Sequence, residues 1–448
     1  MPVMCELERA TRRSSPMPGR LNIFQRSMLR WNDLHPYNAV HVTQISEALD
    51  LNRLRLAIHA TLESQGLTNL HLNRDRGTYL YHGGPAECEI RIIPKDGPSL
   101  GSLQAEIEHQ INTRFVQGER LNPFRFFVDA HEHSFALGLV YFHPVADAEA
   151  IVHLMMHIVD RFAGRAGRQP EDSPNLHPRR HDQVFRQPPG LLVRKLAALP
   201  SAFRDMRRSS RPRYRDPEDF HNGFLFFPLP SGSVRLLMDA SKTLGVTLHD
   251  LFLALLMNAL SPLAADRLRS RRRKKISLGS IVNLRKDLGS EYAEAFGLYL
   301  GSFVVTHEVP EHLSVKALAG DIRQQTLRIK RHKLYLGTPL ELVLGRLALS
   351  LFSTEQGKKF YQKHYPLWGG ITNMNLNRLG KQKDGAGMNG YFRAVSTGPV
   401  TPLVLSITTA GDAANIGVTY RSTAFGAAEI AQVRERLLEG IDSLASRV

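Results

Sequence analysis

The chain has 448 residues, of which 42% are hydrophobic, and a formal net charge of +16 at pH 7. This length exceeds what a single hydrophobic core usually serves, so we expect two domains. The sequence contains no run of about 18 uncharged apolar residues, which argues against a membrane-spanning helix. The only two cysteines, Cys5 and Cys88, lie far apart. This excludes a disulfide framework and favours a reducing, cytoplasmic location.

The first 165 residues divide into a tail and a mixed α/β region. Residues 1–20 are polar and lack the apolar segment of a signal peptide, so they are expected to form a disordered tail. Residues 21–165 alternate between helical and strand patterns and are predicted to form a first subdomain. Helical spacing predicts helices near 51–62 and 103–115, and apolar runs predict strands near 89–93, 124–130 and 134–142.

The remaining chain begins with a connection and continues as a second mixed α/β region. Residues 166–221 are rich in proline, arginine and serine and are expected to form a crossover, with a short helix near 191–199. Residues 222–448 are predicted to form the second subdomain. It should contain a helix that begins after Thr247 as N-cap, a terminal helix near 430–441, and strands near 276–282, 300–306, 403–409 and 416–421.

His143 and Asp147 form a His-x-x-x-Asp pair between the buried strand at 135–142 and a helix with apolar residues at helical spacing. A histidine at a strand end is fixed by the sheet and can still face a cavity, as a general base requires. Asp147 can cap the helix that follows. The alternative interpretation is a histidine that only satisfies local hydrogen bonds.

This pair resembles the His-His-x-x-x-Asp-Gly signature of the acyltransferases that use CoA or carrier-protein thioesters, which include condensation domains, wax ester synthases and BAHD enzymes. Phe142 stands at the first histidine position and Ala148 at the glycine position. Three later segments, in the same order and spacing as in these families, extend the resemblance over roughly residues 20–448. They are the Asn-Leu-Arg segment at 281–285, a Gly-Asn-Phe-like segment at 296–304 and a Ser-Asn-like strand at 370–375.

The resemblance implies a mixed α/β fold of two chloramphenicol-acetyltransferase-like subdomains in a V, with the active site and a tunnel between them. It implies that His143 is the general base and that Asp147 has a structural role, orienting its loop by pairing with an arginine. Arg285 is the best candidate for that partner, because a buried carboxylate without a counter-charge is costly. The donor would be an acyl-CoA or acyl-phosphopantetheine cosubstrate, and no bound cofactor is expected.

Candidates for stabilising the oxyanion or lining the tunnel are Asn283, Ser302, Thr372 and Asn373, each of which can also be an ordinary strand residue. No Gly-x-Ser-x-Gly elbow is present, and neither cysteine lies in a nucleophile motif. A covalent acyl-enzyme is therefore not expected.

Two basic clusters account for much of the net charge. One spans residues 204–215, and the other contains Arg271, Arg272, Arg273, Lys274 and Lys275. They are either solvated surface or a site that attracts CoA phosphates, an acidic acyl carrier protein or an anionic membrane. Aromatic residues are not interleaved with the second cluster, and no nucleic-acid-binding module surrounds it, so nucleic acid is not expected as a partner.

Two further patterns allow other interpretations. Glu149, His153 and His157 recur every four residues and could ligate zinc, but they lie on the polar face of their helix, and we expect no metal there. Residues 339–352 are almost entirely apolar and predict a core helix, a tunnel wall or a helix with peripheral membrane contact.

Taken with the resemblance, these patterns predict an acyltransferase that forms an ester or amide from a thioester donor and a small-molecule alcohol or amine acceptor. The alternative is a non-catalytic binding or scaffold protein with the acyltransferase fold. The departures at Phe142 and Ala148 motivate that alternative.

Overall fold

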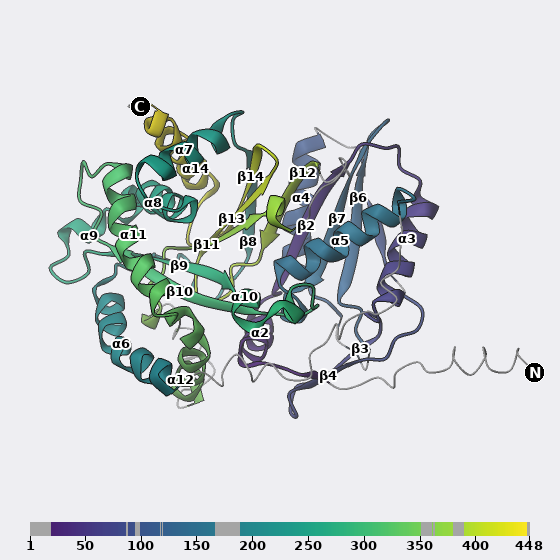
Figure 1. The fold of residues 1–448 in the computed structure, drawn as a ribbon, viewed down its shortest axis with the longest axis horizontal. Helices are drawn as coiled ribbons and strands as arrows, with labels where there is room; N and C mark the ends of the chain where they lie inside the picture. Colours follow the sequence, from purple (N-terminus) through teal and green to yellow (C-terminus); the bar gives the residue numbers. More distant parts are fainter. Residues whose placement is uncertain are drawn as a thin grey trace, which may run out of the picture.

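The computed structural model describes residues 19–86, 88–94, 99–116, 118, 120–165, 189–350, 361, 363–379 and 389–445. The predicted tail lies outside this range except for its last two residues, and so does the first part of the crossover, residues 166–188. The fold is mixed α/β, with two subdomains that lie side by side, each built on its own sheet (Figure 1).

The sheet of the first subdomain has five strands in the order β12-β2-β7-β6-β5. Strands β5 and β6 are parallel, and the other neighbours are antiparallel. A separate small sheet in the order β1-β4-β3 lies beside it. The bounds are β1 Gly19–Arg20, β2 Asn38–Ile45, β3 Leu70–Asn73, β4 Thr78–Tyr81, β5 Ile90–Ile92, β6 Phe124–Ala130, β7 Phe135–Phe142 and β12 Asn389–Val395.

The sheet of the second subdomain has six strands in the order β10-β9-β11-β13-β14-β8. Strand β11 is parallel to both of its neighbours, β9 and β13, and the other pairs are antiparallel. The bounds are β8 Asn222–Pro228, β9 Ile276–Asn283, β10 Leu300–His307, β11 Gly369–Asn375, β13 Leu403–Ala410 and β14 Ala413–Arg421.

Helices pack against both faces of the first sheet, and in the second subdomain they gather on one side of the sheet (Figure 1). In the first subdomain they are α2 Ile23–Leu34, α3 Leu51–Ser64, α4 Ser99–Asn112 and α5 Ala148–Phe162, and η1 His143–Val145 is a short 3-10 turn. Helix α6, Pro189–Arg208, follows the crossover. The second subdomain contains α7 Ser233–Thr243, α8 Leu248–Leu260, α9 Asp266–Arg269, α10 Arg285–Leu288, α11 Val315–Arg331, α12 Thr338–Ser350 and α14 Ala427–Ala445, with 3-10 turns η3 Pro262–Ala264, η4 Ser290–Tyr292, η5 Leu334–Gly337 and η6 Leu376–Arg378.

Strand β12 belongs by sequence to the second half of the chain but hydrogen-bonds to β2 in the sheet of the first half. Residues 222–448 therefore do not form a self-contained unit. In its antiparallel register, Arg393 on β12 lies opposite His41 on β2, and Val395 lies opposite Ala39. This crossing places side chains from the second half on the face of the first sheet that is turned toward the second subdomain.

Local sequence explains the elements that position the site. All eight residues of β7 are buried, which its unbroken apolar run permits only in the interior of a sheet. Gly138 on β7 is required because a Cβ there would lie 2.1 Å from the ring of Phe127. Helix α8 begins with a capping box in which Thr247 and Asp250 each accept the other's backbone N–H.

Within the described residues, no single helix has the length and apolar character needed to cross a membrane. Helices α7 and α8 meet these criteria only as a pair bent by 105°.

Candidate active site between the subdomains

A cavity of about 250 Å³ lies between the two sheets. Its walls come from β2, β7 and β12 of the first sheet and from β9, β10, β11 and β13 of the second, and helices α2 and α12 close its sides. His143 is one of the lining residues. The strand-end histidine of the sequence pattern therefore faces a space that both subdomains form.

His143 follows directly on the last residue of β7 and is only 8% exposed. Its Nδ1 lies 3.1 Å from the carbonyl oxygen of Ala146. A carbonyl can only accept, so Nδ1 carries the proton in the neutral ring and Nε2 keeps a lone pair. Tyr37 stacks on the imidazole with the ring centroids 5.4 Å apart. Burial lowers the pKa of His143 to about 4, so the ring is neutral and able to accept a proton at pH 7.

Asp147 connects the His143 loop to the second half of the chain. Its Oδ1 accepts the backbone N–H of Ala150 at 3.1 Å and caps helix α5. Its Oδ2 accepts from Arg285 Nη1 at 2.6 Å and from the Tyr299 backbone N–H at 2.9 Å. Arg285 also donates to the carbonyl oxygen of Ala295 at 3.0 Å. Asp147 thus ties the His143 loop both to helix α5 and to the second half of the chain. It is only 1% exposed, so its carboxylate binds protein groups and not water.

The two departures from the family signature have different structural consequences. Phe142 points away from the cavity, because side chains alternate along β7 and Tyr141 lines the cavity. Its ring packs in the core of the first subdomain, 6.0 Å from the ring of Phe115 between centroids. Ala148, in contrast, lines the cavity at the start of α5. The residue at the glycine position therefore takes up space beside His143.

The four predicted oxyanion or tunnel residues separate into two pairs. Ser302 and Thr372 line the cavity. Asn283 does not appear among its lining residues, because its amide Nδ2 donates to Glu149 Oε2 on α5 and its Oδ1 accepts from the Arg285 backbone N–H. Asn373 follows Thr372 on β11, so it points to the opposite face of the strand. Asn283 therefore acts as a support for the loop of Arg285 rather than as a wall of the cavity.

The contact with Asn283 also accounts for Glu149, the first residue of the zinc pattern. Among the described residues, no group of three or more His, Cys, Asp or Glu side chains is arranged to hold a metal ion. His153 is partly buried and His157 is exposed on the same helix.

Two buried polar residues of the cavity wall carry no sequence motif and were not predicted. The Nδ1 atom of His41, on β2, lies 2.6 Å from the hydroxyl oxygen of Tyr391, on β12. Burial, together with the nearby charges of Arg393 and His143, lowers the pKa of His41. Arg393 itself lines the cavity and is 3% exposed. Neither residue has a spacing signal in the sequence, because the strands that bring them together lie about 350 residues apart.

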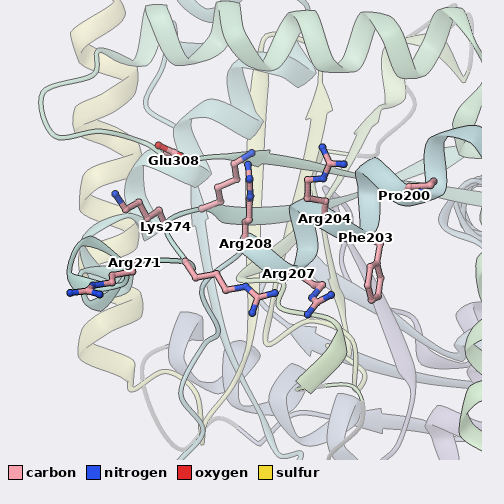
Figure 2. A pocket seen from close by; sticks show the side chains of 10 residues that line it. Pro200, Phe203, Arg204, Arg207, Arg208, Arg271, Lys274 and Glu308 are labelled. Carbon is pink, nitrogen blue, oxygen red and sulfur yellow. The ribbon is translucent and has the colours of Figure 1, made fainter.

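The two basic clusters, some 60 residues apart in sequence, come together at a second hollow of about 680 Å³ (Figure 2). Helix α6 forms one wall, and the segment before β9 forms the other. Seven cations and one carboxylate line it, together with Pro200 and the exposed ring of Phe203; the charged residues are Arg204, Arg207, Arg208, Arg271, Arg272, Lys274, Lys275 and Glu308. This hollow shares no lining residue with the cavity at His143.

Helix α12 covers the apolar run predicted at 339–352, of which residues 351 and 352 lie outside the described range. Thr338, Leu342 and Gly345 on one face line the cavity, as a tunnel wall would. Val343 and Leu344 are exposed on another face.

No family model and no curated protein sequence matches the chain. Solved structures do match the chain. The first condensation domain of the calcium-dependent antibiotic synthetase, in complex with a substrate analogue, has a TM-score of 0.71 and 14% identity, with 96% of this chain and 97% of that chain covered. The cyclization-docking bidomain of the EpoB nonribosomal peptide synthetase from Sorangium cellulosum has a TM-score of 0.68 and 14% identity, with 100% of this chain and 89% of that chain covered.

A third similar structure is the epimerization domain from the third module of tyrocidine synthetase B. Its TM-score is 0.63 and its identity 14%, with 96% of this chain and 97% of that chain covered. These matches cover nearly the whole chain, so the likeness in fold includes both subdomains. The chain has the fold of the condensation domains of nonribosomal peptide synthetases, with two chloramphenicol-acetyltransferase-like subdomains.

Proposed function

We propose that the chain is an acyltransferase of the condensation type. It transfers an acyl or peptidyl group from a thioester on CoA or on a carrier protein to an amine or alcohol. The observation that carries this proposal is the state of His143: a neutral imidazole with Nδ1–H held by Ala146 and Nε2 unprotonated, in a cavity that both subdomains line. General-base catalysis needs such a group and little else from the protein.

In the proposed reaction the acceptor nitrogen or oxygen attacks the carbonyl carbon of the thioester while its proton passes to Nε2 of His143. The new C–N or C–O bond forms, the carbonyl oxygen becomes an oxyanion, and the C–S bond then breaks. The proton moves from Nε2 to the departing thiolate. The hydroxyls of Ser302 and Thr372, which line the cavity, are the candidate donors to the oxyanion.

Support for a carrier-protein donor comes from the fold. The structurally similar proteins are domains of peptide synthetases, named for condensation, cyclization and epimerization. The cavity is lined by residues of both subdomains, so a donor and an acceptor held there would each contact both. An acyl-pantetheine is a small thioester donor without a carrier protein, and it is a suitable first substrate for a test.

The experiment measures thiol release from acyl-pantetheine, acyl-CoA and acyl-carrier-protein donors in the presence of a panel of amines and alcohols. We expect His143→Ala to lower the turnover by roughly 100-fold or more, the usual scale for the loss of a general base. His157→Ala is the matched control, because His157 is an exposed histidine on helix α5 and lies outside the cavity.

Two outcomes contradict the proposal. Wild-type rates in a folded His143→Ala variant would remove the base from the mechanism. Binding of acyl thioesters without thiol release from any acceptor would indicate the non-catalytic binding protein instead. Circular dichroism of both variants establishes that the fold is intact.

A further inference from the structure

Arg393 is a buried cation in the wall of the cavity. It reaches this position because β12 crosses from the second half of the chain and pairs with β2, which sets Arg393 opposite His41. Its Nε donates to Thr408 Oγ1 at 2.9 Å, and its Nη2 donates to the carbonyl oxygens of Ile407 at 2.7 Å and Thr372 at 3.3 Å. These neutral acceptors fix the plane of the guanidinium.

No carboxylate among the described residues forms an ion pair with Arg393. The groups that interact with its charge are the phenols of Tyr141 and Tyr391. Burial raises the pKa of Tyr141 and Tyr391 above the ordinary value, so both are neutral at pH 7. Burial lowers the pKa of Arg393 to about 10, so the guanidinium still carries its charge. A buried charge without a counter-charge is costly, and a bound anion would remove that cost.

Most of the other charged groups that line the cavity are also cations. Arg26 and Arg30 line it from helix α2. The described lining contains one carboxylate, Glu341, which Lys195 neutralises at 2.6 Å. The described lining therefore carries a net positive charge that none of its own residues balances.

The geometry also leaves Arg393 a donor for a ligand. Three of its five N–H groups make the hydrogen bonds to Thr408, Ile407 and Thr372. Among the described residues, Nη1 has one hydrogen-bond contact, with Thr372 Oγ1 at 3.5 Å, which is at the limit of a hydrogen bond. Nη1 carries two N–H groups, so at least one remains to bind an anionic oxygen.

We propose that Arg393 binds the carboxylate of the acyl acceptor, so that the acceptor is an amino acid or hydroxy acid with a free carboxylate. This inference rests on the proposed acyl transfer. Arg393 and His143 line the same cavity, and Tyr141 connects them: its ring lies 5.5 Å from the rings of both His143 and His41, and His41 lies opposite Arg393. An acceptor held by its carboxylate at Arg393 then presents an amine or hydroxyl a few bonds away to Nε2 of His143.

The test compares each free amino acid with its carboxamide, which has nearly the same shape and no charge, using one acyl-pantetheine donor. For the wild type we expect kcat/KM to favour the acid by about 10- to 100-fold, the scale of a hydrogen bond to a charged group. Arg393→Gln should remove this preference, chiefly through the KM of the acid, and leave the rate with the carboxamide within a few-fold. Arg393→Lys should keep part of the preference.

Arg328→Gln is the matched control, because it makes the same substitution at an exposed arginine outside the cavity. It should retain the preference for the acid. Equal use of acid and carboxamide by the wild type, or an equal loss of both in Arg393→Gln, would overturn the inference.

A binding measurement separates this inference from the proposed function. Calorimetric titration of the wild type and Arg393→Gln with the same amino acids and carboxamides needs no turnover. Binding of the acid alone, lost in Arg393→Gln, supports the carboxylate site even where no thiol is released. If Arg393→Gln does not fold, the comparison of acid and carboxamide binding in the wild type decides: equal affinities overturn the site.

Discussion

The imidazole of His143 lies where almost no water reaches it, and this determines how it titrates. Burial lowers its pKa to about 4 from the ordinary value of 6.5, and the opposing effect of the Ala146 carbonyl is smaller. The neutral ring is the active form, so we expect kcat/KM to stay flat from pH 8 down to about 5 and to fall as His143 is protonated near pH 4. Measured with an alcohol acceptor, which does not titrate in this range, a midpoint near 6.5 would contradict this assignment.

The same shift affects stability, with a sign that follows from linkage. The folded state has the lower pKa, so below pH 6.5 the unfolded chain binds a proton at this position that the folded chain does not. The free energy of unfolding should therefore fall as the pH drops from 6.5 to 4, by up to about 3 kcal/mol from this group. Denaturant titration of the wild type and His143→Ala at pH 7 and pH 4.5 measures that difference, because the variant lacks it.

At the level of the elements, the loop of His143 is held by the contact between the N-terminus of α5 and the start of α10. Asp147→Asn removes the counter-charge of Arg285, which is 4% exposed, and we expect a loss of about 3–5 kcal/mol in the free energy of unfolding together with reduced turnover. Asp160→Asn on the same helix is the control. Its ion pair with Arg165 is 43% and 46% exposed, so its loss should cost less than about 1 kcal/mol.

A small effect of Asp147→Asn, similar to that of Asp160→Asn, would show that the loop is held by the remaining backbone contacts. These are the hydrogen bonds from the Asp147 N–H to the carbonyl oxygen of Gly297 and from the His143 N–H to the carbonyl oxygen of Tyr37. Urea denaturation and the thiol-release assay on the same samples distinguish lost stability from a displaced base.

The strands that the sequence predicted are those with a clear apolar run, and the strands that it missed have polar residues inside the run or a distant pairing partner. Strands predicted at 124–130 and 134–142 are observed at Phe124–Ala130 and Phe135–Phe142, because apolar residues dominate the first run and fill the second. Strand β2 was not predicted, since Asn38, His41 and Thr43 interrupt its apolar pattern and yet are buried. Strand β12 pairs with β2 across about 350 residues, which no local pattern can indicate.

The residues of the site divide in the same way into those that the sequence predicted and those that it missed. His143, Asp147 and Arg285 belong to segments with recognisable spacing, and the structure brings them together. His41 and Arg393 have no such spacing, because they meet only where two strands from distant parts of the chain lie side by side. Residues contributed by a crossing strand therefore need a structure to be found.

At the scale of the whole molecule, the net charge of +16 is unevenly placed, and the basic hollow holds a large share of it (Figure 2). Lys275 lines the hollow and Gly279 lines the cavity, four residues apart along β9, or about 13 Å. The field of exposed charges extends only about 8 Å at physiological ionic strength. We therefore expect the hollow to act on a carrier-protein donor by direct contact and not to steer a small donor into the cavity.

We expect the triple reversal Arg271→Glu, Arg272→Glu and Lys274→Glu to raise the KM for an acyl-carrier-protein donor about tenfold and to reduce its salt dependence, since each exposed pair contributes up to about 1 kcal/mol. The KM for acyl-pantetheine and the turnover at saturation should hardly change. Arg273 and Lys275 are left in place because they bind Ser209 and Asp205.

The control for this last prediction carries the same change in charge, spread over the surface as Arg55→Glu, Arg235→Glu and Arg328→Glu, three exposed arginines that do not line the hollow. If the control raises the carrier-protein KM as much as the triple reversal does, the net charge matters and the hollow does not. A rise in KM confined to acyl-CoA would instead place the nucleotide phosphates in the hollow, beside the exposed ring of Phe203. Donor kinetics that respond to none of these changes would make the basic hollow ordinary solvated surface, because direct contact with a donor cannot survive three reversed charges.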